Sequence, residues 1–402
     1  MKRSTDRILT THAGSLVRPV EIIEAMMALD VGKPFDRTTY CETLREQVAK
    51  VVQEQARVGI DVIDDGEFGK NSWISYVAER MTGLELVTRG RTKDLPQIRW
   101  PEEDRYGDFY RTYQATEYSQ WLPDTPSKAE YLAAGAAFQG VVCRGALRYK
   151  PEALERDIAN LKAALRGVAV GEAFMPVVAP CSLEYMPNHH YKTQDDFLFA
   201  IADALSVEYH MIADAGLIVQ VDDALLPMQY FMQFRNRGFG EYVKWAKVRV
   251  EALNHALKGI PEDRVRYHVC FGSQNIPHTT DAGLKDIIEL VLGVRTQGYS
   301  IEASNPRHEH EWQLWKDVKL PAGKILIPGV ISHSTNIVEH PELIALRISN
   351  FARLIGRENV IAGSDCGFSQ SWNSIRVHPQ VQWAKLEALV AGARLASKAL
   401  WR

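Results

Sequence analysis

The sequence lacks a long hydrophobic run. No stretch of 18 apolar residues occurs in the 402 residues, and Lys2 and Arg3 are not followed by the apolar core of a secretory leader. We therefore expect neither secretion nor membrane spanning. An excess of basic charge is also missing, because 47 Lys and Arg face 50 Asp and Glu, for a formal net charge of −3. This balance gives no electrostatic case for binding nucleic acid or an anionic membrane.

Cysteine is scarce as well. The five cysteines are odd in number and widely spaced, at Cys41, Cys143, Cys181, Cys270 and Cys366. This spacing does not form a disulfide framework, and it favours a reducing, cytoplasmic location. With 46% hydrophobic and 24% charged residues, the chain has the composition of an ordinary globular protein with an ample core.

A repeated pattern of helix, stop and apolar strand predicts the fold. In the first half, a charged helix from Thr38 to Val58 ends at Gly59 and leads into the strand 60–67. Later apolar strands are predicted at 217–223, 299–302, 324–333 and 360–366. Continuous apolar strands alternating with helices indicate a buried parallel sheet, and roughly eight such units predict an α/β fold, a (β/α)8 TIM barrel.

Residues 84–130 interrupt this pattern. Aromatic residues alternate there with charges such as Arg89, Arg91 and Lys93, and no helical or strand period is maintained. An insertion of this length in a compact domain is usually a lid, an oligomer contact or partly disordered, and its aromatic residues argue against disorder. We expect one barrel domain over 1–402 that carries this insertion. The sequence leaves open whether the insertion covers a site and whether the chain forms a homo-oligomer.

A candidate metal site starts at His268 and Cys270. Alternate residues of a strand point to the same face, roughly 7 Å apart, so an imidazole and a thiolate at this spacing can share one ion. Glu302 and Cys366 each end another apolar run. One nitrogen, two sulfurs and a carboxylate suit zinc better than magnesium or calcium. Taken alone, a His-x-Cys pair is a weak signal, because most intracellular cysteines are small buried hydrophobic residues.

Other reactive side chains occupy the same kind of position. The carboxyl ends of the strands in a (β/α)8 barrel form the active-site face. Residues at or just past such ends are Ser15, Glu67, Asp222, His268, Cys270, Glu302, His333 and Cys366. This common placement predicts a site at that rim. For Asp222, the alternative is a helix N-cap, which loops between strand and helix commonly carry.

Several of these segments together resemble a known family. The sequence is similar to the catalytic barrel of cobalamin-independent methionine synthase, in the superfamily that includes uroporphyrinogen decarboxylase and epoxyalkane:coenzyme M transferase. Besides the His268/Cys270 pair and Glu302, the resemblance rests on the segments 11–19, 59–67, 220–223, 328–333 and 365–367. It covers nearly the whole chain except the insertion.

The resemblance implies roles for these residues. It implies that His268, Cys270, Glu302 and Cys366 bind Zn2+, that Ser15, Glu67 and Asp222 hold the amino-acid part of homocysteine, and that His333 supplies a proton near the leaving group. Each role is chemically reasonable: zinc deprotonates a bound thiol at neutral pH, acids pair with an ammonium, and histidine is the commonest proton donor.

Two features of the sequence depart from the family. Full-length methionine synthase has two barrels, and the second helps to bind the polyglutamate tail of methyltetrahydrofolate. The segment 179–191 does not match the pterin-side motif either. The implied reaction transfers a methyl group to a small-molecule thiol, most simply homocysteine in methionine biosynthesis. The donor is methylfolate or a methylcorrinoid, and we expect the corrinoid or a smaller donor to be better.

Two alternatives remain open. The first is a zinc-dependent alkyl transferase or lyase that acts on another thiol such as coenzyme M, although a sulfonate should call for a basic residue where Glu67 and Asp222 stand. The second is a non-catalytic barrel with structural zinc. Structural zinc usually lies in closed sites of closely spaced Cys and His ligands, so placement at the rim argues against it.

Overall fold

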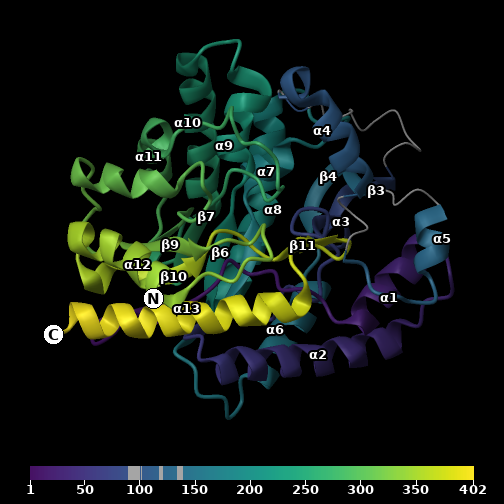
Figure 1. The fold of residues 1–402 in the computed structure, drawn as a ribbon. Coiled ribbons are helices and arrows are strands. Elements are labelled where there is room, and N and C mark those ends of the chain that lie inside the picture. Colours follow the sequence, from purple (N-terminus) through teal and green to yellow (C-terminus); the bar gives the residue numbers. More distant parts are fainter. Residues whose placement is uncertain (89–99, 101, 117–120, 134–138) are drawn as a thin grey trace.

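Eight parallel strands form a nearly closed barrel surrounded by helices (Figure 1). The computed structural model describes residues 1–88, 100, 102–116, 121–133 and 139–402. The strand order is β1-β10-β9-β8-β7-β6-β5-β2. At the seam between β1 and β2, Asp61 N donates to Thr10 O at 3.1 Å and Thr11 Oγ1 donates to Val62 O at 2.8 Å. The predicted TIM barrel is confirmed.

The barrel strands are short and buried, apart from the first two residues of β5, as expected for parallel strands covered by helices. They are β1 Leu9–Thr10, β2 Val62–Ile63, β5 Glu172–Val178, β6 Ile218–Asp222, β7 Val265–Val269, β8 Gly298–Glu302, β9 Ile325–Ile331 and β10 Ile361–Ser364. The segment predicted as a strand at 60–67 contains only β2, because the chain turns immediately after Ile63.

Long amphipathic helices form the outer layer. They are α1 Val20–Asp30, α2 Arg37–Val58, α6 Glu152–Ala164, α8 Gln194–Asp214, α10 Phe239–Ala256, α11 Leu284–Leu292, α12 Pro341–Ile355 and α13 Pro379–Leu400. The predicted helix from Thr38 to Val58 is α2, and Gly59 ends it in the left-handed region with φ 96°. No helix in the described part of the chain is both long enough and apolar enough to cross a membrane.

Other elements include further helices and two hairpins. The helix α4 Glu103–Thr116 has 14 residues, and α3 Val77–Arg80, α5 Lys128–Ala133, α7 Pro180–Glu184 and α9 Leu225–Gln229 are short. The smaller hairpin pairs β11 Ser369–Ser371 with β12 Ser374–Ile375. The larger hairpin pairs β3 Met81–Thr88 with β4 Gln139–Tyr149 between β2 and β5, and α4 and α5 lie between its strands.

The larger hairpin is the inserted region. It leaves the barrel at Met81 and returns at Tyr149, so it is longer at both ends than the predicted 84–130. The register shifts between Thr82 and Leu84, which obscures the alternation that would have identified β3 as a strand. The charges predicted at Arg89, Arg91 and Lys93 lie outside the described residues.

Candidate metal and substrate site

Two strands bring together, at the carboxyl end of the barrel, three side chains that could bind a metal ion. His268 lies in β7, Cys270 follows β7 directly, and Cys366 follows β10. A ring nitrogen and the two Sγ atoms all lie within 4.8 Å of one another, and the two sulfurs are 3.7 Å apart. Two thiolates bound to one tetrahedral zinc at about 2.3 Å would be about 3.8 Å apart. The spacing of the sulfurs therefore fits zinc without rearrangement.

The ring of His268 is oriented as a metal ligand should be. Nδ1 lies 3.0 Å from Ser300 Oγ on β8, the residue that pairs with His268 in the sheet register. Nε2 is buried and has no hydrogen-bond partner. A polar partner on one ring nitrogen usually fixes the tautomer so that the other nitrogen can bind the metal. The unpartnered Nε2 and the two sulfurs are thus the donor set that zinc would need.

The two cysteines share one negative charge in this arrangement. The hydrogen bond between them lowers the pKa of Cys366 and raises that of Cys270, and His268 stabilises the Cys366 thiolate further. Burial opposes both ionisations because a charge is poorly solvated there. Cys366 is therefore the thiolate of the pair.

Glu302 ends β8 beside this group but does not belong to it. Its Oε1 accepts from Phe271 N at 2.8 Å, and its Oε2 accepts from Asn305 Nδ2 at 2.9 Å. These bonds tie the end of β8 to the loop that follows Cys270. The group within 4.8 Å therefore contains three of the four predicted ligands, and metal binding by Glu302 stays a prediction.

Ser15 contacts the loop that follows Cys366. Its backbone oxygen accepts from Phe368 N at 2.8 Å, and its side chain is buried. A Cβ atom at Gly367 would collide with Ser15 Oγ, so glycine at this position lets the two loops approach each other.

Glu67 and Asp222 are buried near Ser15 but are already paired. Lys70 Nζ lies 3.4 Å from Glu67 Oε2 and donates to Pro176 O at 2.5 Å. Gln220 Nε2 donates to Asp222 Oδ1 at 2.7 Å. Burial raises the pKa of Asp222 to about 8, although His268 and Lys70 partly oppose the increase. The two acids can receive an ammonium, but without one Glu67 is paired with Lys70 and Asp222 mostly keeps its proton at pH 7.

His333 points into the same region from the end of β9. Its Nε2 lies 3.3 Å from Ser273 O, and its buried Nδ1 has no hydrogen-bond partner. Burial lowers the pKa of His333, against the charges of Cys366 and Glu302, which raise it. The ring is consequently neutral at pH 7, which makes it a weaker proton donor than an exposed histidine.

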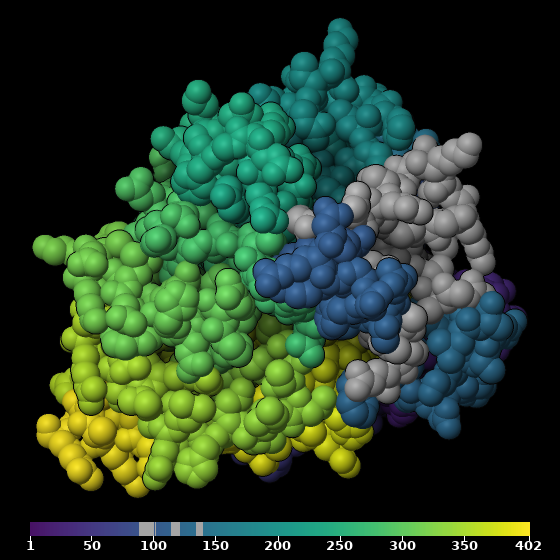
Figure 2. Space-filling view, turned by 45° about the horizontal axis from the view of Figure 1, so that its top comes forward, coloured from purple at the N-terminus to yellow at the C-terminus, as the bar shows by residue number. Residues whose placement is uncertain are grey.

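The insertion forms part of the wall around the cysteines. Trp100 packs against an apolar group that contains Cys270, Cys366 and Phe231, and its ring stacks on that of Phe231 with centroids 6.3 Å apart. Figure 2 shows α4 (blue) resting on the green surface of the loops that follow the central strands. Tyr113 OH of α4 accepts from Asn275 N at 3.0 Å. The insertion therefore covers the site, which the sequence left open.

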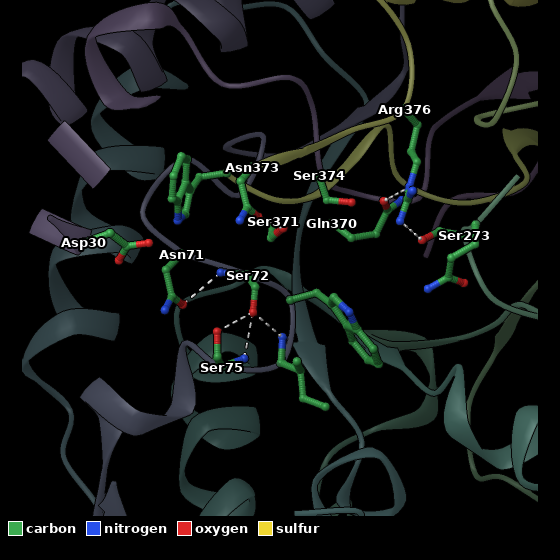
Figure 3. Close-up of a pocket in the computed structure, with 14 residues that line it drawn as sticks. Asp30, Asn71, Ser72, Ser75, Ser273, Gln370, Ser371, Asn373, Ser374 and Arg376 are labelled. Carbon is green, nitrogen blue, oxygen red and sulfur yellow. Dashed lines mark hydrogen bonds between the residues drawn. The ribbon is translucent and has the colours of Figure 1, made fainter. Parts of the chain in front are cut away.

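A cavity of about 90 Å³ lies beside Gln370. Its lining includes Trp73, Ser273, Gln370, Ser374 and Arg376, and Figure 3 shows Arg376 reaching toward Gln370 and Ser273. Gln370 Nε2 lies 3.9 Å from Cys366 Sγ, so the cavity reaches the metal-ligating group through this side chain.

Sequence reasoning missed several residues that organise the site. Asp365 accepts from Ala303 N, Ser304 N and Ser304 Oγ at 2.8, 2.9 and 2.6 Å, and so joins the ends of β8 and β10. Its position beside Cys366 was a usable signal. Ser300 was missed because its partner His268 lies on another strand. Lys70, three residues after Glu67, and Gln370, four residues after Cys366, each lay close enough in sequence to a predicted site residue to be considered.

A second buried cluster lies behind Phe271. The ring of His308 stacks on Phe271 with centroids 3.6 Å apart, and its two nitrogens contact Glu311 and Asp281 at 2.8 and 3.1 Å. His278 Nδ1 contacts the same Asp281 oxygen at 2.8 Å. Burial opposes the charge on His308, but these hydrogen bonds raise its pKa to about 9. The cluster is therefore charged at pH 7 and braces the loop after Cys270.

Comparison with known proteins agrees with this fold. The family model "Cobalamin-independent synthase, Catalytic domain" matches residues 8–128. The chain is 23% identical over 348 residues to a 5-methyltetrahydropteroyltriglutamate–homocysteine methyltransferase of Thermotoga petrophila, covering 84% of this chain and 38% of that protein. It is 24% identical over 396 residues to a methionine synthase of Sulfurisphaera tokodaii, covering 97% and 93%.

A solved structure gives the same result. The B12-independent methionine synthase of Shewanella sp. W3-18-1, in complex with selenomethionine, superimposes with a TM-score of 0.70 at 17% identity, over 98% of this chain and 99% of that one. The chain spans about two fifths of the length of the Thermotoga methyltransferases it matches, at 38% and 42%. The family model, the relatives and the fold agree: over much of its length the chain is similar to the catalytic domain of cobalamin-independent methionine synthase.

Proposed function

We propose that the protein is a zinc-dependent methyltransferase that moves a methyl group to the sulfur of homocysteine to give methionine. The observation that carries the proposal is the buried, unpartnered Nε2 of His268, which shares a 4.8 Å group with the sulfurs of Cys270 and Cys366. An unsatisfied buried nitrogen facing two thiols is costly unless a ligand completes it. The family names of the relatives point to the same chemistry.

One set of residues would bind the zinc, and a second set would bind the substrate. His268, Cys270 and Cys366 would hold the zinc, with Glu302 as the fourth ligand once it releases one of its hydrogen bonds. Zinc stabilises the thiolate form of a bound thiol at neutral pH and keeps it nucleophilic. The protein's own residues orient the acceptor: Glu67 and Asp222 receive the ammonium group by charge-assisted hydrogen bonds.

The aromatic wall contributes by excluding water. Cys270 and Cys366 are only 3% and 7% exposed, so methyl transfer would occur away from bulk solvent. The methyl group leaves the donor, a new sulfur–carbon bond forms, and the thiol proton goes to solvent or to a nearby base. Rim placement of the ligands around such an enclosed space favours this function over a structural zinc site.

We propose a donor whose leaving group departs without a proton. His333 has a pKa lowered by burial, so it is poorly suited to protonate a folate amine at neutral pH. A corrin-borne or smaller methyl group needs no such proton. The enclosed cysteines favour the smaller of these donors, because a wide donor would have to displace the wall formed by Trp100 and Phe231.

The position of Lys70 beside Glu67 is the one observation that favours a sulfonate thiol as the methyl acceptor. A buried ammonium beside Glu67 could bind the sulfonate of a thiol such as coenzyme M, and the enzyme would then be an alkyl transferase or lyase. Lys70 is, however, already bonded to Glu67 and to Pro176 O. The buried acids outnumber it, so an aminated thiol remains the better acceptor.

Thiol binding to the zinc-loaded protein tests this proposal. We expect homocysteine to bind about tenfold to a hundredfold more tightly than 3-mercaptopropionate, because a lost charged hydrogen bond is worth about 1.5–3 kcal/mol. X-ray absorption at the zinc edge should show an added sulfur with homocysteine. The preference for homocysteine should disappear in the double variant Asp222→Asn/Glu67→Gln. The control is Gln382→Glu, which changes the charge of a buried residue on α13 outside the site and should keep the preference. Equal binding of the two thiols by wild type, or tighter binding of a sulfonate thiol, would contradict the proposal.

A further inference from the structure

The loop that follows Cys366 contains a side chain that touches the cysteine sulfur. We propose that Gln370, held by Arg376, is a positioning residue for Cys366 and connects helix α4 of the insertion to the metal centre. The inference rests on the metal centre of the proposed function and adds residues to it. It concerns the retention of metal and the properties of one thiolate, and it does not depend on which thiol or donor is used.

Gln370 is placed to donate to Cys366. Its Nε2 lies 3.9 Å from Cys366 Sγ and also donates to Gly367 O, and the side chain is only 9% exposed. A donor to a metal-bound thiolate spreads its charge and fixes the direction of its lone pairs.

Arg376 decides which way the amide of Gln370 points. An amide has a carbonyl oxygen that accepts and a nitrogen that donates, and the two ends are otherwise interchangeable in shape. Arg376 Nε donates to Gln370 Oε1 at 3.1 Å (Figure 3). Nε2 is thereby left toward Cys366 Sγ, 3.9 Å away. A guanidinium cannot accept a hydrogen bond, so the reverse orientation would place two donors against each other.

Arg376 also binds the other walls of the site. Its Nη2 donates to Ser273 Oγ at 3.4 Å, and the backbone oxygen of Ser273 contacts His333. Its Nη1 donates at 3.3 Å to Tyr113 OH on α4, and that hydroxyl also accepts from Asn275 N. One guanidinium therefore joins the loop after Cys366, the loop after Cys270 and the insertion.

This arrangement gives the insertion a chemical role besides cover. Movement of α4 would shift Tyr113, then Arg376, and so loosen the amide that faces Cys366. Residues behind metal ligands typically change metal affinity or activity by about 10- to 100-fold when they are replaced. We expect replacement of Gln370 to weaken metal binding by a factor within that range. Tyr113 contacts Gln370 only through Arg376, so its replacement should have a smaller effect.

Cobalt(II) binding tests the proposal with a readout that a purely structural role would not change. Cobalt(II) reports its thiolate ligands by a charge-transfer absorption, which moves to longer wavelength when a thiolate loses a hydrogen-bond donor. We expect this shift, and about 10- to 100-fold weaker metal binding in competition with a chelator, for both Gln370→Met and Gln370→Glu. Gln370→Glu keeps an acceptor for Arg376 but has no N–H for the sulfur. Tyr113→Phe should show a smaller shift in the same direction.

Matched controls separate this role from general damage to the loop. Ser371, the residue after Gln370, donates its hydroxyl to Asn373 Oδ1 and not to the cysteine. Ser371→Ala should therefore leave cobalt affinity and absorption as in wild type. Circular dichroism of each variant checks folding. The proposal is wrong if Gln370→Glu retains the wild-type absorption and affinity, or if Ser371→Ala changes both equally. Wild-type protein that binds neither cobalt nor zinc would instead refute the metal centre of the proposed function.

Discussion

The two halves of the candidate site differ in how far the protein satisfies its own polar groups. The thiol half, made of His268, Cys270 and Cys366, has a buried ring nitrogen without a hydrogen-bond partner. The amine half, made of Ser15, Glu67 and Asp222, pairs its acids with Lys70 and Gln220. An unsatisfied buried group is costly and a satisfied one is not. The thiol half is therefore preorganised for an added ion, whereas the amine half must exchange internal partners for the substrate's ammonium.

The largest effect should come from removing a ligand of the thiol half. We expect about one zinc per chain in protein purified without chelators, and at least about a hundredfold weaker binding in Cys366→Ser or His268→Ala, while the barrel stays folded. Elemental analysis and chelator competition measure this. Cys181→Ser, at a cysteine that is equally buried but outside the group, should keep its zinc. Full activity in metal-free wild type would refute the whole mechanism.

Removing the internal cation of the amine half should have the next largest effect. Lys70→Met leaves the carboxylate of Glu67 buried without its partner, which should lower the free energy of unfolding by about 3–5 kcal/mol. Homocysteine should restore part of this stability in urea unfolding, because its ammonium takes the place of Lys70, and 3-mercaptopropionate should not. Lys70→Arg keeps the charge and is the control. A Lys70→Met variant as stable as wild type would show that the pair contributes nothing.

The buried cluster of His308, Asp281 and Glu311 behind Phe271 should make the free energy of unfolding depend on pH. The pKa of His308 is raised to about 9 from an ordinary 6.5, so its contribution is fully present below about pH 6.5 and is lost as pH rises through about 9. The contribution is on the order of 3 kcal/mol. Unfolding free energies at pH 6 and pH 10, in chelated protein, should differ more for wild type than for His308→Gln. His210→Gln, at a partly exposed histidine on α8, is the control. Identical pH dependence in wild type and His308→Gln would contradict the assignment.

The smallest effect is expected at His333. With methylcobalamin or a small donor, His333→Ala should change kcat by less than about threefold, because that leaving group needs no proton. Methyltetrahydrofolate triglutamate should be a poor donor for wild type. Steady-state assays of both proteins with each donor measure this. Rapid turnover with the folate that collapses in His333→Ala would show that the donor is the folate and that His333 is its acid.

Local patterns in the sequence were sufficient for the barrel and for the position of most site residues. The helix that ends at Gly59 and the strands that end at Asp222, Glu302 and near Cys366 could be predicted because glycine stops and apolar runs act over a few residues. In a parallel barrel all strand ends point one way, so residues at those ends share one rim. His268, Cys270 and Cys366 were identified in this way and from the family resemblance, and the structure brings their ligand atoms together.

Only the tertiary structure decided how each side chain is used. Glu302 binds Phe271 N and Asn305, Lys70 neutralises Glu67, and Arg376 orients Gln370. It also placed the insertion over the cysteines, although the insertion has no sequence period. These outcomes depend on distances between loops of different strands, and a hydrogen bond forms or fails over a few tenths of an ångström. Sequence pattern determines which strand end carries a residue, and packing of the whole barrel determines what that residue touches.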